Sequence, residues 1–395
     1  MKTSYHIIII GGGIIGQIMG LAAAQTGCKV AIIDSRDMNI SPQDGRAFAI
    51  AASGIRMLER LGLDLSTLMQ PITSILVTDG NKNSPWKLNF GDEYQSEQTA
   101  SMIESIALYE QIQNLARTKN NIEFLSSHHI KAWDFKTDSS AITLGNGKTL
   151  TSTLMIAADG RNSQTRQSAG IETTKKSFGQ SALVTTIEHS LPHHGLATQR
   201  FLKGGPLAVL PLRNTRSQIV WSNNSEATEA AIALADDSFI ALLSEHIGPH
   251  LGDITLTAPR QSYPLINQLA EAMSSQRLAL IGDAAHVIHP LAGQGLNLGL
   301  RDIAALSHEI EQARRLGQDI GVVGLRNYED WRQTDTQLMS NFTDNLNTLY
   351  QTPSSTLAHL RKTGISLINQ SQFLKSFIMD EAAGNTGELP ALMKM

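Results

Sequence analysis

The chain has 395 residues, a formal net charge of -4 and a single cysteine, Cys28. The length indicates two domains or one domain with a large insertion, and the charge gives no electrostatic reason to expect a nucleic-acid partner. One cysteine excludes an intramolecular disulfide framework and fits a reducing compartment such as the cytoplasm. No run of about 18 apolar residues is present that would span a membrane.

The first element is predicted to be a strand that runs directly into a glycine-rich turn. The apolar run at 6–10 is followed by GGGIIG, which places Gly11, Gly13 and Gly16 in a G-x-G-x-x-G pattern. In that pattern the first glycine permits the turn, and the second lets the backbone approach a pyrophosphate. The third lets the helix and the strand pack closely.

The pattern continues with a helix predicted over 14–26 and a second strand predicted over 29–33, which ends at Asp34. The first N–H groups of the helix would face phosphate groups, and Asp34 is placed to accept hydrogen bonds from ribose hydroxyls. Because strand, turn, helix, second strand and acidic residue all occur in order, the segment predicts a dinucleotide-binding unit.

The next region mixes helices and strands. The residues DGRAFAI lead into a helix predicted over 47–61, and another helix is predicted over 104–119. Short strands are expected at 75–78, 86–90, 122–134, 141–150 and 154–157.

The last of these strands leads into ADGRNSQTRQSAG. Asp159 lies at the strand end, and Ser163 and Arg166 are spaced to begin a helix. The plain alternative to a binding site is an ordinary helix that Asp159 or Ser163 caps, with Arg166 on a solvated face. Residues 178–263 then become rich in β-segments, with one helix near 225–247.

Residues 277–302, RLALIGDAAHVIHPLAGQGLNLGLRD, carry the most specific pattern of the chain. An apolar strand ends in Gly282 and Asp283, and a loop then leads into a helix. The loop lets a flat ligand approach its backbone through three residues, Pro290, Gly293 and Gly295. A flavin fits this pattern, because its ribityl hydroxyls can donate to the aspartate and its ring edge can face the helix N–H groups. A strand-turn-helix without a ligand is the alternative.

Two histidines of this segment, His286 and His289, have the spacing of weak metal ligands, but no third ligand is visible. We therefore expect no metal, and we expect His289 to fix the loop beside Pro290 by hydrogen bonding. No dedicated nucleophile or acid–base triad is recognisable, so no catalytic side chain is assigned.

Taken in order, G-x-G-x-x-G, D-G-x-x-S-x-x-R and G-D-A-A-H-x-x-x-P-x-x-G-Q-G-x-N resemble the FAD-dependent aromatic hydroxylases of the p-hydroxybenzoate hydroxylase type. The segments DGRAFAI, RFLKGGPLAVLPL, IVWSNN, IHPLAGQGLNLGLRD and GELPALM are similar to those of the ubiquinone-biosynthesis hydroxylases, so the resemblance covers almost the whole chain.

The resemblance implies an α/β fold. It predicts an FAD-binding Rossmann-like domain of the glutathione-reductase type, an inserted substrate domain with a mixed β-sheet, and a helical C-terminus. We expect the FAD-binding domain at 1–70, 101–177 and 264–350, the substrate domain at 71–100 and 178–263, and the tail at 351–395.

The resemblance also implies which residues bind FAD. Arg46 would contact the phosphate or ribityl region, Asp283 would accept from a ribityl hydroxyl, and Asp159 and Arg166 match a motif implicated in both FAD and NAD(P)H binding. The loop with Pro290, Gly293 and Gln294 would lie near the flavin ring. The full expected set is Gly11, Gly13, Gly16, Asp34, Arg46, Asp159, Arg166, Gly282, Asp283, Gly293, Gly295, Leu296 and Asn297.

The implied reaction is hydroxylation of the aromatic ring of a lipophilic, polyprenylated phenol in ubiquinone biosynthesis. NAD(P)H binds transiently as electron donor, and O2 reacts with reduced FAD by way of a C4a-hydroperoxyflavin. Phe201 and Trp221 lie on β-segments and are candidates either for the wall of the substrate cavity or for plain sheet core.

The C-terminal part of the chain combines helically spaced apolar residues with few charges. We expect these residues either to face a membrane or a quinone-biosynthesis complex, with the protein peripheral on the inner face of the membrane, or to pack on the FAD-binding domain. They are Leu338, Phe342, Leu346, Leu360, Ile365, Ile368, Phe373 and Phe377.

Two other functions fit parts of the sequence. An FAD-dependent isoprenoid reductase or epoxidase would keep the flavin motifs, and a non-catalytic scaffold subunit would keep FAD without turnover. A plain NAD-dependent dehydrogenase would leave the GDAAH segment without a use.

Overall fold

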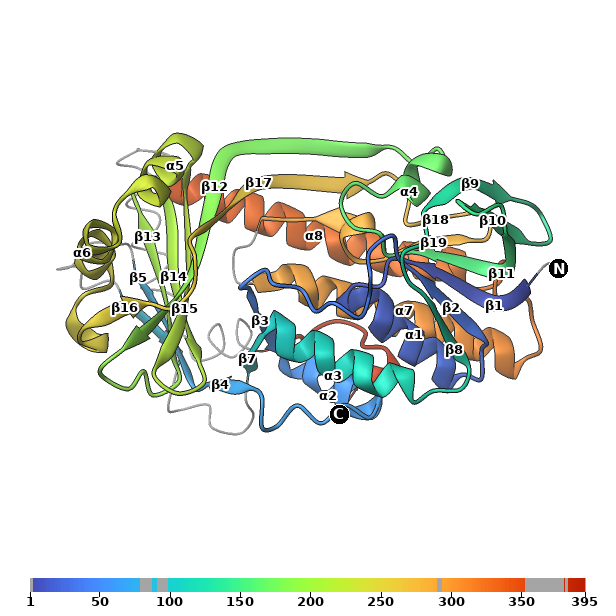
Figure 1. Ribbon diagram of the computed structural model, residues 1–395, viewed down its shortest axis with the longest axis horizontal. Coiled ribbons are helices and arrows are strands. Elements are labelled where there is room, and N and C mark those ends of the chain that lie inside the picture. The colour runs from blue at the N-terminus through green and yellow to red at the C-terminus, as the bar shows by residue number, and fades with distance from the viewer. Residues whose placement is uncertain are drawn as a thin grey trace.

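The computed structural model describes residues 3–78, 87–90, 99–289, 293–351, 380 and 383–394, which form a mixed α/β structure with three sheets. An eight-stranded sheet with its helices lies at one end of the molecule and a nine-stranded sheet at the other (Figure 1). A small three-stranded sheet lies between them (Figure 1).

The eight-stranded sheet has a parallel centre. β1 (Thr3–Ile10) lies between β11 (Thr149–Ala157) and β2 (Val30–Ile33), with β19 (Leu278–Leu280) beyond β11 and β8 (Ile122–Leu125) beyond β2. The last four residues of β1 are apolar and buried, as expected for a parallel strand that is covered on both faces. The strand and turn predicted at the start of the chain are thus confirmed.

Helices and antiparallel strands complete this sheet. α1 (Ile14–Gln25) packs against both α7 (Gln294–Arg315) and α3 (Ser105–Arg117). The short α4 (Gln164–Ser168) follows β11, and α8 (Leu325–Gln351) packs on α7. The remaining strands are β9 (Ile130–Phe135), β10 (Ser140–Leu144) and β18 (Ser274–Ser275).

The helix predicted over 47–61 begins later than expected. β3 (Ala47–Ala51) is a strand, and α2 (Ala52–Arg60) follows it. β3 pairs with β7 (Ala100–Glu104), which also pairs with β4 (Gln70–Ile72). Pairing with β7, a strand distant in sequence, therefore overrides the local helical pattern, because all five residues of β3 gain partners on that strand.

The nine-stranded sheet has the order β20-β17-β12-β15-β14-β13-β5-β6, with β16 beside β12. Its outer face is covered by α5 (Ser225–Ala233) and α6 (Asp236–Ile247), where the sequence predicted one helix. The helix is divided because Leu234 is extended. The strands are β5 (Ser74–Thr78), β6 (Lys87–Phe90), β12 (Thr173–His189), β13 (Leu196–Leu202), β14 (Gly205–Leu212), β15 (Arg216–Asn224), β16 (Ile254–Leu256), β17 (Gln261–Ala270) and β20 (His286–Val287).

Two long strands connect the halves of the molecule. These strands are β12 and β17, which both run continuously from the helical half to the nine-stranded sheet (Figure 1). β12 pairs with β17 along its first part and with β15 along its second part. The domain boundaries expected after residue 177 and before residue 264 therefore fall within strands.

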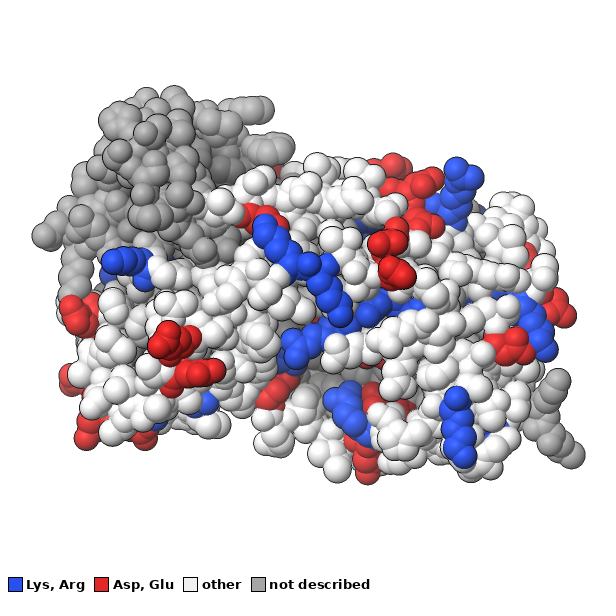
Figure 2. Space-filling view, turned by 90° about the horizontal axis from the view of Figure 1, so that it is seen from above, with Lys and Arg blue, Asp and Glu red and all other residues white. Residues whose placement is uncertain are grey.

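Figure 2 views the molecule from above and shows Lys and Arg side chains across the middle of that face, with Asp and Glu on both sides. The charge exposed on that face is therefore mixed in sign.

The C-terminal segment at 383–394 docks on α2. Arg56 of α2 donates to the Asn385 side chain at 2.6 Å and to the backbone carbonyl of Met393. No helix in the described ranges is long and apolar enough to cross a bilayer. Pro290 lies outside the described residues, as do five of the expected apolar tail positions, Leu360, Ile365, Ile368, Phe373 and Phe377.

Candidate active site

A cavity of about 1230 Å³ lies between the eight-stranded and the nine-stranded sheet. It is lined from Asp34, at the end of β2, to Gln199, on β13. A site for a single drug-sized ligand usually measures about 300–1,000 Å³, so this cavity has room for a large cofactor and a second molecule.

The glycine-rich turn forms one end of the cavity. Gly11 has a φ of +107°, and a Cβ there would lie 2.2 Å from the carbonyl oxygen of Ala158. A Cβ on Gly16 would lie 1.8 Å from the carbonyl oxygen of Gly11, so this glycine is required for the contact between helix and strand. A Cβ on Gly13 would meet nothing within 4 Å, and Gly13 lines the cavity.

Asp34 lies beside this turn and is held by donors on both carboxylate oxygens. It accepts from the N–H of Gly12 at 2.8 Å and from the backbone and guanidinium of Arg36 at 2.8–3.2 Å. Burial would raise the pKa of Asp34, but these hydrogen bonds outweigh it and lower the pKa, so the carboxylate is ionised at neutral pH. The Arg36 side chain is 70% exposed, so a ribose hydroxyl that bound to Asp34 could displace it.

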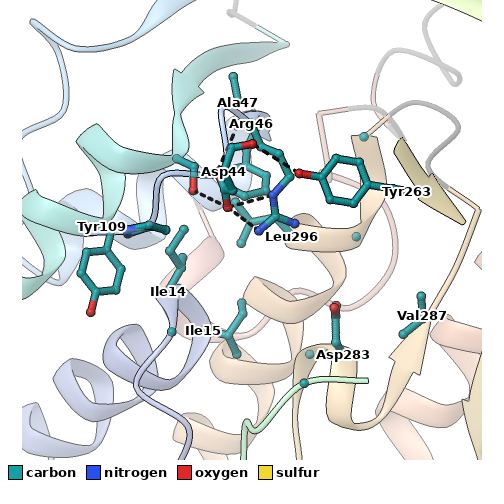
Figure 3. Close-up of a pocket in the computed structure, with 18 of the residues that line it drawn as sticks. Ile14, Ile15, Asp44, Arg46, Ala47, Tyr109, Tyr263, Asp283, Val287 and Leu296 are labelled. Carbon is teal, nitrogen blue, oxygen red and sulfur yellow. Dashed lines mark hydrogen bonds and ion pairs between the residues drawn. The ribbon is translucent and has the colours of Figure 1, made fainter. Parts of the chain in front are cut away.

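Asp283 lies on the floor of the cavity. Gly282 has a φ of +58°, and the resulting turn presents the Asp283 side chain to the cavity, near Ile15 and Val287 (Figure 3). By surface area Asp283 is exposed, because its side chain opens onto the cavity. The protein atoms around the cavity desolvate its carboxyl and raise its pKa, and the opposite charges of His286, Arg46 and Arg161 reduce the increase.

The N-terminus of α7 faces the same cavity. Gly293 caps the helix in a left-handed conformation, with a φ of +65°, and no side chain caps the first N–H groups. Gln294, Gly295 and Leu296 line the cavity, and a Cβ on Gly295 would meet nothing within 4 Å. The first turn of α7 therefore offers free N–H groups to an electron-rich ligand atom.

Asn297 also lines the cavity, but its amide group is bonded to β3. Its Oδ1 accepts from the N–H of Ala51 at 2.9 Å, and its Nδ2 donates to the carbonyl of Ala49 at 2.9 Å. Asn297 thus holds the three-stranded sheet against the start of α7.

The turn at Gly282 is fixed by a buried carboxylate that the sequence reading did not single out. Asp302 on α7 accepts from the Gly282 N–H at 2.9 Å, from His286 Nε2 at 2.6 Å and from Arg332 Nε at 2.8 Å. Burial alone would raise the pKa of Asp302, but His286 and Arg332 hold it below its usual range. Only the spacing of Asp302 on the apolar face of a helix could have indicated a buried acid.

His289 was expected to fix the loop by hydrogen bonding, and this expectation is wrong. Within the described residues, neither ring nitrogen of His289 has a hydrogen-bond partner, whereas His286 bonds to Asp302. His289 is fully buried, and the edge of its ring meets Phe178. No group of three metal-ligating side chains is found among the residues that the structure describes.

The burial of His289 predicts a stability that falls in acid. Burial lowers its pKa to about 4, and a histidine in an unfolded chain has a pKa of about 6.5, so the unfolded state binds the proton more tightly. The contribution of neutral His289 to the free energy of unfolding is complete above pH 6.5, and it falls by up to about 3 kcal/mol as the pH drops to 4. Urea unfolding at pH 7 and pH 4.5 should therefore show a smaller acid loss for His289→Leu than for the native chain. An equal loss in both proteins would contradict this origin.

Asp159 and Arg166 are close in sequence but occupy different environments. Asp159 lines the cavity and accepts from Ser163 Oγ at 2.5 Å. Ser163 caps α4, as the plain alternative predicted. Arg166 is buried and is not among the lining residues, because its Nη1 donates to the carbonyl of Ala284 at 2.7 Å. It thus joins this motif to the loop that carries Asp283.

Arg46 lies at the margin of the cavity and is exposed. It donates to Asp44 from Nε at 2.9 Å and from Nη2 at 2.6 Å. Its guanidinium lies over the rings of Phe48 and Tyr263, at 5.6 and 5.9 Å from their centroids. In Figure 3, Arg46 and Tyr263 approach each other, and Asp283 lies below them in the view.

The two aromatic candidates for the cavity wall are not among the lining residues. Trp221 points to the opposite face of the sheet, where it packs with α6, because its neighbours Val220 and Ser222 face the cavity. Successive side chains of a strand alternate between faces, and Trp221 follows the second of the two alternatives, the sheet core. Phe201 is buried near the end of β13.

The wall is instead built from residues that the sequence reading did not name. Gln218 bonds to the loop of Arg46 through the Gly45 carbonyl, at 3.0 Å, and the Ala47 N–H, at 3.1 Å. Tyr263 donates to the carbonyl of Asp44 at 3.3 Å. Strand alternation was the available signal, but it could not decide which face was inner.

The residues of the cavity fit FAD. Two helix N-termini without side-chain caps face one cavity, next to Gly13 and Gln294, and each matches an electron-rich part of the cofactor. Asp34 and Asp283 can accept from the ribose and ribityl hydroxyls. The open space beside Gly13 and Gly295 would admit a ligand close to the backbone.

Comparisons with known proteins agree with this geometry. The chain matches the model of the FAD-binding domain family over residues 4–339. It is 37% identical to the ubiquinone hydroxylase UbiL of Rhodospirillum rubrum, over 98% of this chain and 92% of that protein. It is 30% identical to the mitochondrial ubiquinone biosynthesis monooxygenase COQ6 of Danio rerio, over 95% of this chain and 89% of that protein.

Solved structures show the same fold. The p-nitrophenol 4-monooxygenase PnpA of Pseudomonas putida superposes with a TM-score of 0.81 at 19% identity, over 98% of this chain and all of that chain. PqsL of Pseudomonas aeruginosa, in complex with 2-aminobenzoylacetate, gives 0.78 at 20% identity, over 92% of this chain and 99% of that chain. The resemblance read from the motifs is confirmed, and the chain belongs to the FAD-binding family that includes the ubiquinone hydroxylases.

Proposed function

We propose that this chain is an FAD-dependent monooxygenase that uses NAD(P)H and O2 to hydroxylate the aromatic ring of a polyprenylated phenol in ubiquinone biosynthesis. Residues 1–70, 101–177 and 264–350 would bind FAD, and residues 71–100 and 178–263 would receive the phenol. The proposal is carried by one observation: the same cavity joins the glycine-rich turn and the start of α7 to an apolar sheet face.

Each part of the cavity has a distinct task in this proposal. The N–H groups at the start of α1 would bind the pyrophosphate, and Asp34 would accept from the ribose. Asp283 would orient the ribityl chain, and the first turn of α7 would stabilise negative charge at the ring edge. FAD supplies electron transfer and oxygen activation, whereas the chain supplies orientation and a cavity that excludes water.

A lipophilic phenol has to reach this cavity from a membrane or a partner. Leu338 and Phe342 lie about one turn apart on α8 and are 66% and 61% exposed. We propose that they contact a membrane surface, on which the enzyme is peripheral. Replacing both with aspartate should slow turnover of a phenol embedded in vesicles but not of a phenol in detergent. Equal rates for the double variant and the native chain in vesicles would contradict the proposal.

The function is tested with purified, FAD-loaded protein. NAD(P)H oxidation should be slow alone and much faster when a prenylated phenol is present, and ¹⁸O from ¹⁸O2 should enter the ring. FAD that is bound but never reduced by either nicotinamide is the result expected of a scaffold subunit. Reduction without ¹⁸O in the ring would favour a reductase, and ¹⁸O in the isoprenoid chain would favour an epoxidase.

A further inference from the structure

The face of the nine-stranded sheet that lines the cavity is built mostly from small apolar side chains. The pairing of β12, β15, β14 and β13 places Val184, Val220, Ala208 and Gln199 in one row across the sheet, and all four line the cavity. Further lining residues of this sheet are Ala182, Ala197, Pro206 and Leu210. Gln199 therefore brings an amide group into an otherwise apolar row.

The other amide and phenol groups on this wall are already bonded. Gln218 bonds to the backbone of the Arg46 loop, and Tyr263 bonds to Asp44. Thr198 lines the cavity next to Gln199, but its strand partner Val209 packs in the core on the far side of the sheet, so its hydroxyl faces that core. In the described part of the chain, the Gln199 side chain has no hydrogen-bond partner.

We propose that the Gln199 amide hydrogen-bonds to an oxygen substituent on the aromatic ring of the substrate and so determines which ring carbon faces the flavin. This inference rests on the proposed function. An amide has one carbonyl that can accept from a phenol hydroxyl and two N–H groups that can donate to a ring oxygen.

The surroundings of Gln199 make this contact selective. A ring oxygen that entered the apolar wall without a partner would lose its hydrogen bonds to water, at a cost in binding. Ala208 and Ala197 occupy little space beside Gln199, so a flat ring can lie against the wall with its oxygen at the amide. A ring turned the other way would leave both the oxygen and the amide unpaired.

The test compares two ligands on three FAD-loaded proteins. The ligands are a prenylated phenol and the matching prenylated toluene, in which a methyl group replaces the hydroxyl. The proteins are the native chain, Gln199→Leu, which removes the amide, and the control Gln312→Leu, which makes the same replacement on the exposed surface of α7, away from the cavity. Binding is followed by the change in the flavin absorption spectrum, and the hydroxylated ring position is identified by mass spectrometry and NMR.

Gln199→Leu should weaken binding of the phenol about fivefold to tenfold, leave binding of the toluene unchanged, and mix the ring positions of the product. Gln312→Leu should bind both ligands as the native chain does. Equal phenol affinity in Gln199→Leu and the native chain, or an equal loss of phenol affinity in Gln312→Leu, would overturn the inference.

The native chain separates this inference from the proposed function. If the native chain hydroxylates no phenol, the proposed function fails. If it hydroxylates the phenol but Gln199→Leu behaves in the same way, only the role of Gln199 fails. If Gln199→Leu loses FAD or melts at a lower temperature than the native chain, the test uses Gln199→Met instead. The methionine side chain is long and flexible, and it also lacks the amide.

Discussion

Replacing Asp302 with alanine is expected to lower the free energy of unfolding by about 3–5 kcal/mol. Asp302 is fully buried and accepts from the Gly282 N–H, His286 and Arg332. Among the residues that the structure describes, its removal leaves the buried Arg332 charge with Asp335 as the one remaining ion-pair partner, and the Gly282 N–H loses its Asp302 acceptor. Because whole domains are stable by only about 5–15 kcal/mol, this single change would remove a large share of the stability.

The loss should be visible at the cofactor site as well as in stability. Gly282 sets the position of Asp283, so the variant should also bind FAD more weakly. Urea unfolding followed by circular dichroism measures stability, and quenching of flavin fluorescence measures FAD binding.

A control at an exposed carboxylate shows whether the burial of Asp302 causes the expected loss of stability. Asp134 pairs with Lys136 at 3.0 Å, but both side chains are more than half exposed, at 53% and 63%. Asp134→Ala should therefore change the free energy of unfolding by less than about 1 kcal/mol and leave FAD binding intact. If Asp302→Ala were as mild as Asp134→Ala, the buried network would not be what holds the loop.

The contrast between Asp283 and Asp302 shows what the sequence could predict. Asp283 comes three residues after the end of β19 and precedes a glycine-containing loop, so its position at the cavity follows from local order alone. Asp302 lies on a helix among apolar residues, and its partners come from a turn 20 residues earlier and a helix 30 residues later. No local pattern indicates such pairing, because it depends on how α7 and α8 pack.

The same limit applies to the sheets. The β3 segment AFAIA was assigned to a helix because its partner β7 is distant in sequence. The sequence left Trp221 open between the cavity wall and the sheet core, because alternation separates two faces without saying which is inner. The register with β14 and β12 decides this, and it is a property of the whole sheet. The segments proposed to bind FAD are predictable because each needs only a few consecutive residues to adopt its geometry.

The largest contrast between folding and binding is expected at two glycines of one turn. Gly16→Ala should prevent stable folding, because its Cβ would lie 1.8 Å from the carbonyl oxygen of Gly11, and neither backbone segment can move without separating α1 from β1. Gly13→Ala should fold normally. Its φ of -72° suits any residue, and its Cβ would meet no protein atom within 4 Å.

Gly13→Ala should nevertheless bind FAD about tenfold more weakly or worse, which corresponds to a loss of about 1.4 kcal/mol or more. The added methyl group would occupy the space beside the free N–H groups of α1, where the pyrophosphate is proposed to lie. Melting of the FAD-free protein measures folding, and fluorescence titration with FAD measures binding. A Gly13→Ala protein that binds FAD as tightly as the native chain would show that the pyrophosphate lies elsewhere. A Gly16→Ala protein with the same melting temperature as the native chain would show that α1 can move away from β1 at little cost in stability.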